Sequence, residues 1–348
     1  MALLPVTGNE MRFHALIGTG GIGTGSFFAL NGNHTLGREE SRTGKFLENK
    51  DYAKLHIITH YVQTLMGPQF KALPIGRIGT DEAGRRLYSE MASAGLDLRY
   101  VRALDDAPSM NCVCLLYPDG SGGNLTVGDS ACGRVDTTAI REALPDFVVF
   151  AGRGIALAAP EVPLEARAEL LGLATRHRFF RAASFTSEEM RSALVSTMLA
   201  EVDLLVINHD EAAALGEVSS DQPTQVIAAK AAEKARSMQP GMWAIVTAGT
   251  KGSWAWNGHH LAHLPAYEVK SVNAAGAGDA FFAGVLTGLA SGLSFEDAQQ
   301  LGGLTGALSV TSPHTIHPDI DRVSLAAFVW IQQVKPSPSV MRILGVGP

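Results

Sequence analysis

Three small residues followed directly by an acid form the part of the chain best suited to chemistry. Gly276, Ala277 and Gly278 carry almost no side chain, so their backbone N–H groups can approach a ligand closely. The apolar stretch after Asp279 predicts a buried helix over 280–291. N–H groups at a helix start lack intrahelical acceptors and lie at the positive end of the dipole, which suits phosphate. Asp279 then has two interpretations: a general base for a substrate hydroxyl, or an acid that only stabilises the helix dipole.

A second pair of polar residues follows the predicted strand 202–207. Asn208 and Glu211 have the spacing of a helix capping box, which gives them a purely local role. They also stand at the carboxyl end of a strand, where open α/β sheets bind ligands. A carboxylate that keeps metal-bound water suits Mg²⁺. Both roles remain open at this point.

A glycine pattern near the N-terminus offers a different function. Gly18, Gly20 and Gly23 satisfy G-x-G-x-x-G after the predicted strand 13–17, as in dinucleotide-binding units. Such a unit needs a helix and a second buried strand within about 30 residues. Residues 37–51 are too polar to be a buried parallel strand. A NAD(P)-dependent oxidoreductase is therefore kept only as an alternative.

Four motifs in a fixed order give the chain a family resemblance. The stretch 272–284 resembles the C-terminal signature of the ribokinase-like (PfkB) carbohydrate kinases, and 76–97 resembles a second signature of that family. Between them, 208–211 and 247–252 match two further motifs in the family's order. The likeness covers roughly residues 75 to 315.

The resemblance implies an ATP-dependent kinase that transfers the γ-phosphoryl group to a hydroxyl of a small sugar-like or nucleoside substrate. Asp279 would be the general base, and the amides of Gly276, Ala277 and Gly278 would form the anion hole. The residues that it assigns to ATP and to Mg²⁺, with Glu211 acting on the metal through water, are Asn208, Glu211, Thr247, Gly249, Gly252 and His314. The family's monovalent-cation site usually has Asp where this chain has Asn273, so activation by potassium is left open.

The acceptor side departs from the family pattern. The family's substrate-binding Asp would fall near Gly23, yet no acid lies between Glu10 and Glu39. The residues that we assign instead to the substrate are Gly21, Gly44, Lys45 and Asn49. Because of this departure, a catalytically altered nucleotide-binding protein of the same fold is a further alternative.

Composition limits the partners and the compartment. The chain has 348 residues, 46% of them hydrophobic, and a formal charge of −6, so we expect no nucleic-acid or anionic-membrane partner. Residues 1–10 lack the features of a signal peptide, and no run of 18 apolar residues predicts a membrane span. Three cysteines do not suggest a disulfide framework, which favours a cytoplasmic protein.

These residues must be positioned by an α/β fold. From residue 146 onward strands and helices alternate, beginning with a predicted strand at 147–150, which is typical of a mostly parallel central sheet with helices on both faces. The chain then forms one ribokinase-like domain over 12–335. Insertions at about 24–48 and 103–131 would build a small β-sheet lid, and 336–348 would be a tail. A homodimer formed through the lid is the assembly that we consider.

Overall fold

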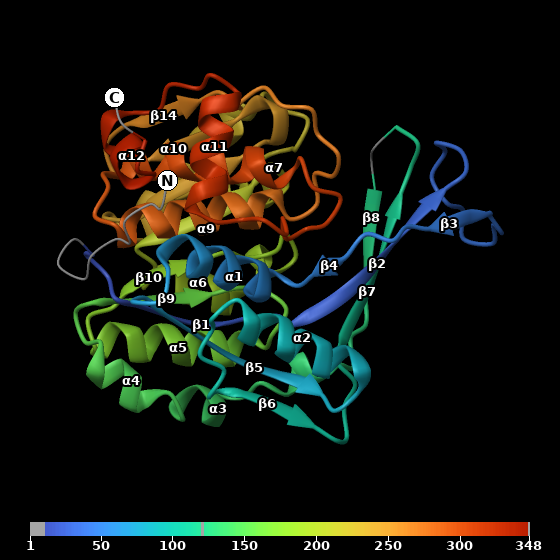
Figure 1. Ribbon diagram of the computed structural model, residues 1–348, viewed down its shortest axis with the longest axis horizontal. Helices are drawn as coiled ribbons and strands as arrows, with labels where there is room; N and C mark the ends of the chain where they lie inside the picture. Colours follow the sequence, from blue (N-terminus) through green and yellow to red (C-terminus); the bar gives the residue numbers. More distant parts are fainter. Residues whose placement is uncertain (1–10, 120–121, 347–348) are drawn as a thin grey trace.

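The computed structural model, which describes residues 11–119 and 122–346, contains a main sheet of nine strands in the order β14-β13-β12-β11-β10-β9-β1-β5-β6 (Figure 1). Seven neighbouring strands run parallel, and β13 and β14 are antiparallel at one edge. In chain order these strands are β1 Ala15–Thr19, β5 Lys71–Gly79, β6 Val101–Leu104, β9 Gly154–Ala158, β10 Phe180–Ala183, β11 Leu204–Asn208, β12 Trp243–Thr247, β13 Ser253–Trp256 and β14 Leu261–Leu264. The predicted fold class, a ribokinase-like α/β fold with a mostly parallel sheet, is confirmed.

Helices cover both faces of this sheet, which explains why β1 and β9 are buried along their whole length. Leu16 of β1 packs into one apolar cluster with α1 and α9, whereas Ala15 and Ile17 pack into a second cluster with α5 and α8. The helices are α1 Lys54–Met66, α2 Glu82–Ser93, α3 Thr137–Arg141, α4 Leu144–Val149, α5 Leu164–Arg176, α6 Ala193–Leu199, α7 His209–Leu215, α8 Thr224–Met238, α9 Ala277–Ala290, α10 Phe295–Ser309, α11 Arg322–Ile331 and α12 Pro338–Ile343. No helix in the described part of the chain is long and apolar enough to cross a membrane.

Two predicted segments differ from the structure. Residues 147–150, predicted as a strand, lie in and next to α4, and the first strand of the alternating region is β9. Phe147 is buried while Val148 and Val149 are exposed, so the run follows a helix with one inward side rather than a strand buried on both faces. The predicted tail contains α12, whose Val340 is buried in the first cluster, and its last residues 347–348 lie outside the described residues.

A second, smaller sheet projects from one side of the molecule (Figure 1). It consists of β2 Gly23–Leu30, β3 Gly44–Phe46, β4 Asp51–Tyr52, β7 Met110–Leu116 and β8 Gly122–Thr126. The glycine turn after β1 leads straight into β2 at Gly23 and not into a helix. A dinucleotide-binding unit needs that helix, so the alternative interpretation of the glycine pattern as such a unit is wrong.

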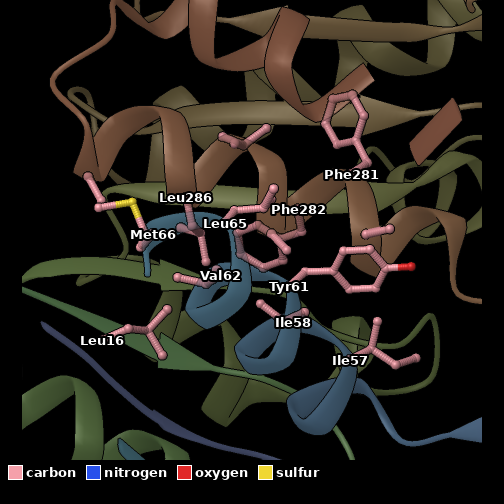
Figure 2. Packing of buried hydrophobic residues seen from close by; sticks show 14 of the residues in the cluster. Leu16, Ile57, Ile58, Tyr61, Val62, Leu65, Met66, Phe281, Phe282 and Leu286 are labelled. Carbon is pink, nitrogen blue, oxygen red and sulfur yellow. The ribbon is translucent and has the colours of Figure 1, made fainter. Parts of the chain in front are cut away.

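Helices α1 and α9 pack against each other in the first cluster. Figure 2 shows Val62 and Leu65 of α1 lying beside Phe282 and Leu286 of α9. The amino ends of the two helices carry Lys54 and the 277–279 turn. This packing therefore fixes Lys54 and Asp279 relative to each other.

Candidate active site

The glycine-rich turn begins α9 as predicted, three residues earlier than expected. Gly276 caps the helix with φ +76°, and a Cβ there would lie 2.9 Å from the Thr315 Cβ atom. Only glycine fits both conditions without strain. The N–H of Ala277 donates to the carbonyl of Ala274 at 3.3 Å, whereas those of Gly278 and Asp279 lie in the first turn, where a helix offers no acceptor. Of the three predicted amides, that of Ala277 therefore has an internal acceptor, whereas Gly278 and Asp279 present their N–H groups at the open end of the helix.

A large cavity of about 920 Å³ opens beside this turn at the carboxyl ends of β11 and β12. It is lined by most of the residues that the sequence assigns to the nucleotide, namely Asn208, Glu211, Thr247, Gly249 and Gly252, and by Ala277, Gly278 and Asp279. Its size is in the range of pockets that enclose small ligands. His314 is not among the lining residues, and its Nδ1 accepts the backbone N–H of Lys50 at 2.9 Å.

Asn208 and Glu211 form the capping box at the start of α7. Asn208 Oδ1 accepts the N–H of Glu211 at 2.9 Å, and Glu211 Oε2 accepts the N–H of Asn208 at 2.8 Å. The local role is confirmed. Glu211 Oε1 is directed to the other side, 3.9 Å from Lys54 Nζ, so one carboxylate oxygen is placed toward the cavity.

A small cavity of about 410 Å³ lies between the glycine turn and the second sheet. Asp51 and Glu161 line it together with Gly276 and side chains of β2, β7 and β8. Lys54 and Asp279 line both the small and the large cavity. These two side chains therefore mark the place where the contents of the two cavities meet.

Lys54 is the basic side chain that lines both cavities, and the sequence analysis did not predict it. Burial lowers its pKa, but the charges of Asp279, Glu211 and Glu161 outweigh burial, so the pKa of Lys54 lies above its ordinary value. The residue is the first of α1, inside a segment that shows only helical periodicity. Nothing in the sequence separates it from the other lysines of this polar region.

The carboxyl groups around Lys54 are less acidic than usual. Burial raises the pKa of Asp279, Asp51 raises it further, and Lys54 opposes both. Burial also raises the pKa of Glu211. For Glu161, burial raises the pKa to about 7 despite Lys54. A carboxylate held near neutral pKa is suited to accept a proton at physiological pH.

Glu161 occupies a strained position. Its backbone has φ +79°, which a non-glycine residue adopts rarely, and its Oε2 accepts the N–H of Lys54 at 3.1 Å. A Cβ at Gly21 would overlap the Glu161 carboxylate, so the glycine leaves room for it. Gly21, predicted as a substrate residue, thus adjoins the small cavity through Glu161.

The other predicted substrate residues lie elsewhere. Gly44 and Lys45 belong to β3 in the second sheet, where Lys45 is exposed, and neither they nor Asn49 line the small cavity. The acid that the second sheet contributes to the small cavity is Asp51, which is only 6% exposed. Its one sequence signal is that it stands just before the amphipathic segment that forms α1.

The sequence of this chain resembles those of known proteins. A family model described as pfkB family carbohydrate kinase matches residues 60–322. The chain is similar to 2-dehydro-3-deoxygalactonokinase of Haloferax volcanii, with 28% identity over 71% of this chain and 77% of that protein. It is also similar to inositol 3-kinase of Arabidopsis thaliana, with 37% identity over 23% of this chain and 22% of that protein.

Solved structures share the fold at low sequence identity. The ribokinase of Giardia lamblia has a TM-score of 0.74 at 14% identity, covering 86% of this chain and 94% of that chain. The ribokinase of Cryptococcus neoformans, solved in complex with ADP, has a TM-score of 0.72 at 19% identity over the same shares of the two chains.

Proposed function

This chain belongs to the pfkB family of carbohydrate kinases, and on that premise we propose that it transfers the γ-phosphoryl group of ATP to a hydroxyl of a neutral polyhydroxyl acceptor, with Asp279 as general base. The observation that carries the proposal is that Lys54 and Asp279 line both cavities. ATP in the large cavity and the acceptor in the small one would meet at these side chains. The proposal favours catalysis over a nucleotide-binding protein that has lost it.

Asp279 takes the proton of the attacking hydroxyl. Its raised pKa makes it a better base than an exposed carboxylate, while the charge of Lys54 favours its ionised form. The N–H groups of Gly278 and Asp279 lie in the same helical turn and would hold the phosphoryl oxygens. One turn thus supplies the base and the anion-binding amides.

Phosphoryl transfer depends mainly on positioning and on neutralising charge. Lys54 places a positive charge between Glu211 and Asp279, where the transferred group would carry negative charge. Glu211 fits Mg²⁺ through water, because its Oε1 is directed toward the large cavity while its Oε2 accepts the Asn208 N–H. When bound, Mg²⁺ would neutralise phosphate charge.

The nucleotide would be contacted from β12 and the turn after it, by Thr247, Gly249 and Gly252.

The acceptor is neutral because of the charges around the small cavity. Three carboxyl groups line it, those of Asp51, Glu161 and Asp279, against the single ammonium of Lys54. A sugar acid would bring a further negative charge beside them, which costs free energy in a partly buried site. Hydroxyl groups can instead donate hydrogen bonds to the carboxylates. The proposed class therefore includes sugars, polyols and nucleosides.

The test is an ADP-release screen over neutral sugars, polyols and nucleosides, with sugar acids as the opposing set. We expect the highest kcat/KM for a neutral acceptor, and loss of turnover when Mg²⁺ is chelated. A sugar acid as the best substrate would contradict the proposed acceptor class. ATP binding without turnover on any acceptor would favour the altered nucleotide-binding protein.

A further inference from the structure

Phosphoryl transfer leaves a pair of thiols in the small cavity without a task. Cys112 and Cys114 are two residues apart on β7, so their side chains point to the same side of the strand. Each Sγ donates a hydrogen bond of 3.1 Å to the same atom, Asp51 Oδ2. All three residues line the small cavity.

Gly25 makes this arrangement possible. It lies on β2 between the two ligand-bearing strands, paired with Asp51 on one side and with Cys112 on the other. A Cβ atom at residue 25 would overlap both Cys112 Sγ and Asp51 Oδ2. The missing side chain therefore lets the carboxylate and the thiols meet across β2.

We propose that Asp51, Cys112 and Cys114 bind a thiophilic divalent cation such as Zn²⁺, and that the bound cation excludes the acceptor from the small cavity. One Oδ atom and the two Sγ atoms lie within 4.8 Å of one another, which is compact enough for a single ion. The fourth position of a tetrahedral ion would face the cavity and hold water. Both thiols release their protons to solvent as the two sulfur–metal bonds form.

The geometry requires only a small adjustment. With Zn–S near 2.3 Å and Zn–O near 2.1 Å, a tetrahedral site separates sulfur from oxygen by about 3.6 Å. The present sulfur–oxygen separations of 3.1 Å must therefore widen by about 0.5 Å. Small rotations of the Asp51, Cys112 and Cys114 side chains can supply this once the thiol protons have left.

Charge and ligand type favour this class of ion. Asp51 acts electrostatically on Glu161 and Asp279, so a cation at the cluster would be attracted by three carboxyl groups. Two thiolates select Zn²⁺ or Co²⁺ over Mg²⁺, which prefers oxygen ligands. The Mg²⁺ that accompanies ATP should therefore not fill this site.

The experiment uses the full chain, stripped of metal, kept reduced without added thiols, and free of nucleotide. Titration with Co²⁺ should produce a thiolate-to-cobalt charge-transfer absorption band, and Zn²⁺ should then abolish it while excess Mg²⁺ should not. We expect Cys112→Ser and Cys114→Ser each to weaken Co²⁺ binding by at least roughly 10-fold, and the double variant to lose the band. Circular dichroism establishes that each variant is folded.

Cys132→Ser is the matched control, because Cys132 is buried and donates to the carbonyl of Ile22, outside the cluster. It should keep the band. Absence of a band in the wild-type chain, or a band that survives in the folded double variant, would overturn the metal site. These readouts do not depend on the proposed kinase reaction.

Competition with the acceptor is measured separately, with an acceptor found in the screen. Zn²⁺ should raise the apparent KM of the acceptor with little effect on kcat, and the double variant should lose this sensitivity. Inhibition that lowers kcat at unchanged KM would overturn the claim that metal and acceptor exclude each other.

Discussion

At the scale of single residues, one lysine influences the pKa values of three carboxyl groups. Lys54 reduces the pKa of Asp279, Glu211 and Glu161, each of which burial alone would raise further. The pKa of the proposed base, Asp279, is therefore a balance in which burial raises it and Lys54 lowers it, with burial the larger of the two. Two predictions follow from this group, one kinetic and one thermodynamic.

Replacing Lys54 with Met should impair catalysis and change its pH dependence. Without the ammonium, the pKa of Asp279 rises further, so the acidic limb of the pH profile of kcat/KM should move up by roughly 1–3 pH units. Loss of charge stabilisation should lower kcat by roughly 10²- to 10³-fold. Lys45→Met is the matched control, since Lys45 is exposed in β3 and should leave the profile unchanged. An unshifted profile in Lys54→Met would contradict the role of this lysine.

Glu161 should destabilise the fold above neutral pH. Burial raises its pKa from 4.5 to about 7, so its stabilising protonated form is fully present below pH 4.5 and is lost as pH rises through about 7. Glu161→Gln keeps the shape and can still accept the Lys54 N–H. We expect equal melting temperatures at pH 4.5 and a higher one for the variant at pH 8. A variant that melts lower than wild type at pH 8 would show that the charged form stabilises the fold.

Single residues also show where the sequence was sufficient and where it was not. The turn at Gly276 and the helix start at Asp279 could be predicted because small residues before an acid and an apolar run are a local pattern. Asp51 and Lys54 could not, because their roles arise only when α1, α9 and the second sheet come together. No local pattern carries that information.

At the scale of elements, the amino end of α9 sets the geometry of the site. Gly276 adopts a left-handed conformation and packs against Thr315, whereas Gly278 lies in the helix with its nearest neighbour, Thr247 Oγ1, 4.0 Å from an added Cβ. Gly276 is thus required by the turn, whereas Gly278 leaves open space beside the large cavity, where we propose that a ligand approaches.

Alanine substitutions at Gly276 and Gly278 should affect fold stability and ATP binding separately. Gly276→Ala should lower the free energy of unfolding by about 1–2 kcal/mol or more, because left-handed backbone and close contact both oppose the methyl group. Gly278→Ala should leave stability nearly unchanged and weaken ATP binding, since its methyl would project into the large cavity. Chemical denaturation and calorimetry distinguish these effects. Equal stability loss in both variants would mean that Gly278 is also needed for the fold.

Within the region where strands and helices alternate, β10, β11 and β12 were all expected close to their observed places. The segment 147–150 was predicted wrongly because a short apolar run does not distinguish a strand from a helix. A proline in the first turn of α4 was the signal that favoured the helix.

At the scale of the whole molecule, the second sheet has two different faces. Its register places Leu125 opposite Val113, on the side away from Cys112 and Cys114, and Phe46 opposite Phe28. Phe46 is 66% exposed and Leu125 is 62% exposed. Exposed apolar side chains on a projecting sheet are a surface on which proteins associate.

The homodimer through the second sheet remains a prediction, and this face is where we expect it. Phe46→Lys and Leu125→Lys should convert a dimer into monomers while the melting temperature of the domain changes little, because neither side chain is buried in the described chain. Analytical ultracentrifugation over a range of concentrations measures the assembly. Wild-type protein that sediments as a monomer at all concentrations would contradict the predicted homodimer.

The most direct measurement concerns Asp279, where the two cavities meet. Asp279→Asn keeps the shape of the side chain and removes the base. We predict that kcat falls by roughly 10²- to 10⁴-fold, while ATP affinity and melting temperature stay close to those of the wild type. A purely structural Asp279 would instead lose about 0.3–1 kcal/mol of stability with activity intact. A folded Asn variant with near-normal kcat would contradict the assignment of Asp279 as the general base.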